Sequence, residues 1–191
     1  MILFTSKAAR MRSSDFRKVS YIPQDVIKSF RPQAIRVWAL TLTAVLLWVG
    51  IIVAAPLLAN DEMTSFSGPI YRFFSFICHQ MPERSFHLGS HQMAVCSRCF
   101  GVYFGLLLGI AIYPLWRRIE NIEPLARIWL ILSIVPITID WSLTVLGIWE
   151  NTHLSRFLTG SILGIACGTF IMPGLIEIIR NTTLLRGVRQ T

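Results

Sequence analysis

Four apolar segments, each about as long as a bilayer core is thick, dominate this chain of 191 residues. They cover residues 37–58, 99–116, 128–146 and 157–179. A helix needs about 20 apolar residues to cross a hydrocarbon core. The chain is also 53% hydrophobic and only 15% charged, which leaves too little polar surface for a soluble domain of this size. The sequence therefore predicts an all-α, polytopic membrane protein with four transmembrane helices, whose first partner is the lipid bilayer.

The basic residues predict the orientation of these helices. If both termini are cytoplasmic, 14 of the 18 Lys and Arg residues lie on the inner side, as the positive-inside rule requires. The other four are Arg72, Arg84, Arg98 and Arg156. We expect a multi-pass protein of the cell (inner) membrane. Its parts are a basic cytoplasmic arm (1–36), a transmembrane domain (37–179) and a basic cytoplasmic tail (180–191).

The net charge of +8 does not indicate nucleic-acid binding. The basic residues flank apolar spans, where they face lipid headgroups, and no basic groove with interleaved aromatic residues is visible. We therefore expect no nucleic acid among the partners.

Glycine recurs every fourth residue in the second and fourth spans. The two sets are Gly101, Gly105 and Gly109, and Gly160, Gly164 and Gly168. Such spacing makes a smooth helix face on which another backbone can approach closely. The two spans run in the same direction, so we expect them to pack in parallel. The same faces are also candidates for contacts in a homo-oligomer.

The loop between the first two spans, residues 59–98, is long for a four-helix protein. Its aromatic segment 67–77 begins with small residues and a proline, which predicts a short helix lying at the membrane interface. This helix would deliver Cys78 and His79 to the top of the bundle, on the side away from the cytoplasm.

The same loop carries a candidate metal site. Cys96 and Cys99 form a Cys-x-x-Cys at the start of the second span, and with Cys78 and His79 they make a Cys3His set typical of zinc. Adjacent residues such as Cys78 and His79 do not easily bind one ion together. Three further side chains remain as substitute ligands: His87, His91 and Asp140. A complete ligand set predicts a structural zinc, and an open position would allow catalysis.

Two alternatives remain open for the cysteines. A helix start and the neighbouring Arg98 both favour the thiolate form of Cys96 and Cys99, so these three residues are catalytic candidates for a membrane thiol-disulfide oxidoreductase, with a quinone as possible cofactor. Such enzymes use two cysteine pairs, whereas this loop has three cysteines. The other alternative is a structural scaffold with one disulfide. No Cys-x-x-Cys-His is present, so covalent haem is not expected. Whether the protein is an enzyme stays open.

Asp140 is the charged residue of the third span, about seven residues or roughly 10 Å from its outer end. A carboxylate at that depth needs a partner, and we predict that the partner is Arg98 or Arg156. The short connection after this span adds Glu150 and Asn151 to the polar site. It also carries a histidine, His153, to which little weight is given because a lone loop histidine is usually solvated.

Two motifs resemble a known family, the uncharacterised membrane proteins grouped as domain of unknown function 2085. The first comprises Cys78-His79-Gln80, Pro82-Glu83-Arg84-Ser85-Phe86 and Cys96-Ser97-Arg98-Cys99, followed by Gly101 and Tyr103. The second comprises Asp140, Glu150-Asn151, Arg156 and Thr159-Gly160. The resemblance covers roughly residues 66–170. It implies a polytopic membrane protein with a characteristic Cys/His motif on its outer face, and it adds Arg84 to the polar site residues.

Overall fold

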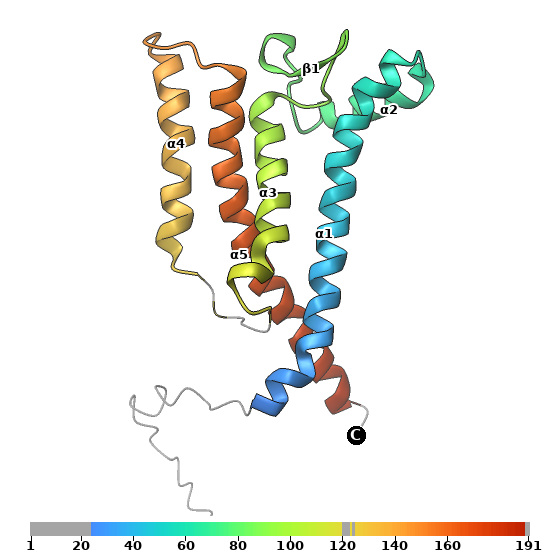
Figure 1. Cartoon of the computed structure of the whole chain (residues 1–191), viewed down its shortest axis with the longest axis vertical. Coiled ribbons are helices and arrows are strands. Elements are labelled where there is room, and N and C mark those ends of the chain that lie inside the picture. The colour runs from blue at the N-terminus through green and yellow to red at the C-terminus, as the bar shows by residue number, and fades with distance from the viewer. Residues whose placement is uncertain (1–23, 120–122, 124, 190–191) are drawn as a thin grey trace, which may run out of the picture.

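A computed structural model describes residues 24–119, 123 and 125–189 of the chain. Within them it has five α-helices, one 3-10 helix and two short strands (Figure 1). The helices are α1 (Gln24–Asn60), α2 (Thr64–Ser75), α3 (Ser97–Trp116), α4 (Arg127–Val145) and α5 (His153–Arg189). The 3-10 helix is Pro82–Arg84, and the strands are β1 (His87–Leu88) and β2 (His91–Gln92).

Helices α1, α3, α4 and α5 are long and apolar enough to cross a membrane. This confirms the predicted all-α membrane architecture with four spanning helices. In Figure 1 they run side by side along the long axis of the molecule. The segment between α1 and α3 covers the end of the bundle where α1 ends and α3 and α5 begin. We call this the loop end, and the opposite end the far end.

The helix boundaries differ most from the prediction at the two ends of the chain. Helix α1 begins at Gln24, well before the predicted span at residue 37, and α5 runs from His153 through most of the predicted tail to Arg189. Hydropathy identifies the part of a helix that lies in hydrocarbon, whereas backbone hydrogen bonding continues beyond it into polar sequence. The remainder of the predicted arm, residues 1–23, lies outside the described residues.

The two glycine faces pack against each other within the chain. A Cβ placed on Gly105 would strike the carbonyl oxygen of Ser161, and one on Gly164 would strike that of Val102. The contacts advance in the same direction along α3 and α5, so the two helices pack in parallel, as predicted. Both faces are therefore occupied, which removes the basis for the homo-oligomer predicted through them.

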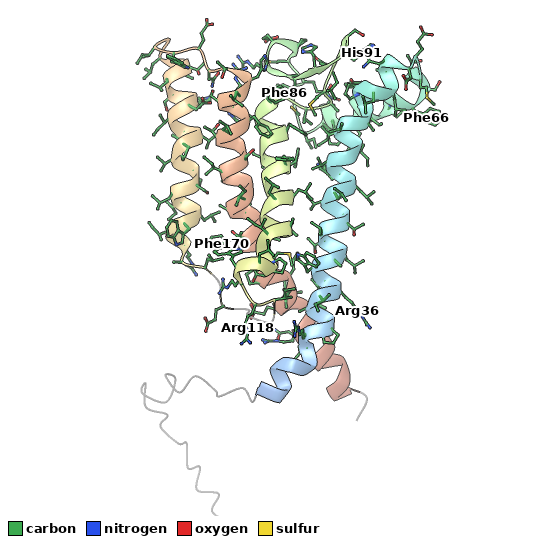
Figure 2. All side chains as sticks on the ribbon, viewed as in Figure 1. Arg36, Phe66, Phe86, His91, Arg118 and Phe170 are labelled. Atoms are coloured by element: carbon green, nitrogen blue, oxygen red, sulfur yellow. The ribbon has the colours of Figure 1, made fainter. Side chains whose placement is uncertain are left out.

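Helix α4 lies at the edge of the bundle beside α5 (Figure 1). All its residues are described, and Ser133 alone is buried. At the far end, a pocket of about 850 Å³ opens between α3, α4 and α5. Its walls are almost entirely apolar and include Trp116, Trp129 and Phe170; Figure 2 shows Phe170 in the half of the bundle away from the loop end.

The loop-end segment is tied to α1 by buried side chains and hydrogen bonds. Phe74 of the predicted interfacial helix, here α2, packs with Ile52 and Val95 in one core cluster. The Asn60 side chain at the end of α1 donates to the carbonyl oxygen of Leu88 at 2.7 Å and accepts from Ser90. The loop is therefore held in a fixed position over the helix ends.

Topology is tested by labelling a cysteine placed at Ser90, an exposed position in the tip of the β1–β2 hairpin. If the loop faces away from the cytoplasm, a membrane-impermeant maleimide should label Ser90→Cys in intact cells above the level of the parent chain. The matched control is Arg118→Cys at the far end, which should react only after lysis. Labelling of Arg118→Cys but not Ser90→Cys in intact cells would reverse the orientation.

Candidate metal centre

The structure brings three cysteines of the loop end together. Cys78 follows α2, Cys96 is the N-cap residue of α3, and Cys99 lies in its first turn. Their three sulfur atoms all lie within 4.8 Å of one another, and Cys96 Sγ and Cys99 Sγ are 3.4 Å apart. The predicted spatial cluster of Cys78, Cys96 and Cys99 is therefore confirmed.

The backbone around Cys78 is held by Gln80. Its φ of +48° lies in the left-handed region, which reverses the chain after the cysteine and which few side chains favour. The Gln80 side chain donates at 2.8 Å to the carbonyl oxygens of both Tyr71 and Ala94. It thereby links the last turns of α2 to the short segment between β2 and Cys96. Gln80 belongs to the Cys78-His79-Gln80 motif, but the two hydrogen bonds of its side chain were not predicted.

Hydrogen bonding favours a thiolate at Cys78. The backbone N–H of Cys96 donates to Cys78 Sγ at 3.2 Å. Hydrogen bonds from the side chains of Cys96 and Cys99 lower the pKa of the Cys78 thiol far below its ordinary value, against the opposing effect of burial. A sulfur that accepts several hydrogen bonds in this way is suited to bind a cation.

The three sulfurs open into a pocket of about 290 Å³. Its wall also includes His79 and Arg84, both exposed. Neither ring nitrogen of His79 lies within 4.8 Å of all three sulfur atoms. Its role as the nitrogen ligand therefore remains a prediction, which would require its exposed side chain to turn toward the sulfurs.

The substitute ligands predicted from sequence do not join the cluster. His87 and His91 lie in the exposed β1–β2 hairpin, where they pair with Gln92 and Leu88. The Asp140 carboxylate instead pairs with Arg98 and accepts hydrogen bonds from two other side chains. Those three predicted ligands are therefore wrong, because the hairpin turns both histidines toward solvent and the carboxylate is already satisfied.

Asp140 is the centre of a polar network that joins α3, α4 and α5. Arg98 Nη2 pairs with Asp140 Oδ2 at 2.5 Å, and Asn151 Nδ2 donates to the same oxygen at 2.7 Å. The Ser155 hydroxyl donates to Asp140 Oδ1 at 2.7 Å. Both oxygens of this carboxylate, whose side chain is only 9% exposed, are therefore satisfied. The predicted charge pair between Asp140 and Arg98 is confirmed.

Arg156 extends this network without contacting the carboxylate. Its Nε donates to Asn151 Oδ1 at 2.7 Å, and Asn151 in turn contacts Asp140. Glu150, also predicted in this site, is exposed and forms none of these hydrogen bonds. Arg156 therefore positions Asn151, and no carboxylate of the described residues forms a direct ion pair with it.

His153 is a residue that sequence reasoning undervalued. It is the first residue of α5, and its Nδ1 lies 3.0 Å from the hydroxyl of the fully buried Ser97. Phe86 packs against its ring with centroids 5.7 Å apart. These contacts tie the start of α5 to the residue beside Cys96. Only the position of Ser97 inside the Cys-Ser-Arg-Cys motif gave a signal for this contact.

The three sulfurs fit a metal ion of the zinc class. Zinc–thiolate bonds of about 2.3 Å in a tetrahedron require sulfur atoms roughly 3.8 Å apart, which matches three atoms that all lie within 4.8 Å. Three protein ligands would leave a fourth position facing the pocket. Cys78 and Cys96 are 18 residues apart in sequence. The short distances between the three sulfur atoms therefore result from the tertiary fold and not from the geometry of one helix.

Comparison with known proteins places the chain in a family. The family described as predicted membrane proteins, DUF2085, matches residues 78–170. An uncharacterised protein of Methanocaldococcus jannaschii is 39% identical over 110 residues, which is 58% of this chain and 70% of that protein. One from Methanothermobacter thermautotrophicus is 35% identical over 107 residues, 54% of this chain and 93% of that protein. No solved structure matches. The chain therefore belongs to the DUF2085 family of membrane proteins.

Proposed function

We propose that Cys78, Cys96 and Cys99 bind one zinc ion at the loop end, on the side of the membrane away from the cytoplasm. The observation that carries this proposal is the convergence of their three sulfur atoms within 4.8 Å. Thiolate ligands favour zinc among the common metal ions. The backbone N–H of Cys96, which donates to Cys78 Sγ at 3.2 Å, supports the same proposal because it stabilises a thiolate at Cys78.

The metal would connect the loop to the bundle. Cys78 belongs to the segment that follows α2, whereas Cys96 and Cys99 belong to the start of α3. Zinc sites with three protein ligands and an accessible fourth position are typical of catalysis or ligand binding, and such zinc lowers the pKa of a bound water to about 7. The pocket beside the sulfurs supplies this access. His79, in its wall, is the protein residue able to close the fourth position.

Elemental analysis tests the proposal. The anaerobically purified full chain should contain close to one zinc per molecule, and Cys96→Ser should reduce this to background because two thiolates bind zinc far more weakly than three. Cys167→Ser is the matched control, since Cys167 lies deep in α5 outside the cluster; it should keep its zinc. A metal content unaffected by Cys96→Ser would refute the site.

Thiol redox chemistry is the second candidate, supported by the 3.4 Å between Cys96 Sγ and Cys99 Sγ. Two observations favour zinc binding over thiol redox chemistry. The charge of Arg98 is already paired with Asp140, and the large apolar pocket that would suit a quinone lies at the far end. Cys99 and Trp116 lie on the same helix, roughly 25 Å apart at helical rise. Reversible loss of two thiols on oxidation, in protein without zinc, would favour this candidate.

A further inference from the structure

We propose that the cysteine pocket binds a phosphate-type oxyanion through Arg84, next to the three sulfurs. This inference deepens the proposed function, because it names the ligand class for the fourth position of the metal. The contact with the guanidinium itself does not depend on the metal.

The pocket combines soft metal ligands with a free guanidinium. Arg84 lines the same 290 Å³ space as Cys78, Cys96 and Cys99. Among the described residues it has no ion-pair or hydrogen-bond partner for its side chain. A ligand that contacts the open metal position would therefore also meet the donors of Arg84.

The charges around the pocket favour an anion. Arg84 and Arg98 both lie within electrostatic range of Arg156. Asp140 balances one of these three guanidiniums, and a zinc ion with three thiolates carries one further negative charge. One guanidinium is therefore left unbalanced. Like charges held close together repel unless an anion joins them.

Carboxylates of the loop end do not supply this anion. Glu83 precedes Arg84, and Glu150 precedes Asn151; both are exposed, and neither forms an ion pair with Arg84. The guanidinium of Arg84 therefore has no counter-charge among the described residues, which leaves it available to an external anion.

Arg84 is presented by a rigid turn. It ends the 3-10 helix Pro82–Arg84, and its backbone N–H donates to the carbonyl oxygen of Met81 at 3.0 Å. The next residue, Ser85, is fully buried, and its hydroxyl donates to the same oxygen at 2.8 Å. Because these hydrogen bonds hold the turn, the backbone that carries Arg84 loses less freedom on binding than that of an unanchored loop would.

Guanidinium groups bind phosphate oxygens in a bidentate fork, and a zinc ion with an open position accepts an oxygen ligand. Two sources carry this chemistry at a membrane surface: the headgroup of an anionic phospholipid and a soluble phosphate ester. The structure fits the shared phosphate group, and the experiment below separates the two sources.

The test measures binding of inorganic phosphate to the full chain in nanodiscs made only of phosphatidylcholine. The parent chain should bind phosphate by isothermal titration calorimetry, and Arg84→Gln should weaken that binding roughly tenfold or more through loss of charge-assisted hydrogen bonds. Zinc content should not change. Arg72→Gln is the matched control, because Arg72 is an exposed arginine at the same end outside the pocket; it should bind like the parent.

Equal phosphate affinity in Arg84→Gln and the parent, or no phosphate binding by the parent, would overturn the proposal. Elemental analysis of the same samples keeps the metal question separate. Binding that requires Arg84 in protein that never contains zinc would refute the metal centre and leave the anion site standing. The same titration is repeated with the chain in nanodiscs that contain phosphatidylglycerol. Weaker binding of inorganic phosphate there would identify a lipid headgroup as the ligand, and unchanged binding would identify a soluble phosphate ester.

Discussion

Replacing Gly105 with leucine should lower the free energy of unfolding by more than about 3 kcal/mol, enough to prevent a stable bundle from forming. Even the Cβ of the new side chain would strike the carbonyl oxygen of Ser161 on α5. Backbone cannot move aside as a flexible side chain can, so α3 and α5 would have to separate. Their separation would also pull Cys96 and Cys99 away from the start of α5.

The matched control for this change is Gly50→Leu in α1, where an added Cβ meets nothing within 4 Å. Its melting temperature in detergent, followed by circular dichroism, should stay close to that of the parent. Gly105→Leu should melt much earlier or be recovered only as aggregate. Equal melting temperatures for both variants would show that α3 and α5 do not pack through their glycine faces.

Replacing Asp140 with alanine should also be strongly destabilising, by about 3–5 kcal/mol, because it leaves the partly buried Arg98 without its counter-charge. Three hydrogen-bond donors from three different segments, on Arg98, Asn151 and Ser155, would lose their acceptor at once. Helix α4 should respond most, since it has few other buried contacts. We expect proteolysis in the connections flanking α4 to increase before the rest of the bundle unfolds.

Two further variants separate the charge from the packing of this network. Thr138 lies on an exposed face of α4, so Thr138→Val should leave the free energy of unfolding almost unchanged. The double variant Arg98→Leu/Asp140→Leu removes both charges, and it should recover part of the stability lost in Asp140→Ala. If Asp140→Ala were as stable as Thr138→Val, the network would have no structural importance.

Sequence alone was sufficient where one physical constraint acts on a whole segment. The length of a bilayer core determines the four spans, and glycine at every fourth position predicts the close pairing of α3 and α5. The cost of a buried carboxylate predicts that Asp140 pairs with Arg98 or Arg156, and the structure shows the pair with Arg98. The clustering of Cys78 with Cys96 and Cys99 was predicted because the aromatic segment and the second span both reach the same surface.

Sequence was insufficient where the answer depends on how irregular backbone folds. The positive φ of Gln80 and its two hydrogen bonds determine where Cys78 points, and no periodic pattern encodes them. The β1–β2 hairpin directs His87 and His91 to solvent for the same reason. His153 was undervalued because the connection was assumed to continue through it, whereas α5 begins there and places its ring beside Ser97.

Zinc K-edge X-ray absorption on the anaerobically purified full chain tests the central claim most directly, because it reports both the metal and its ligands. We predict three sulfur neighbours at about 2.3 Å and one nitrogen or oxygen neighbour at about 2.0 Å. In Cys78→Ser, any zinc that remains should have at most two sulfur neighbours. A parent chain without zinc, or with zinc that has no sulfur neighbours, would contradict a metal centre built from Cys78, Cys96 and Cys99.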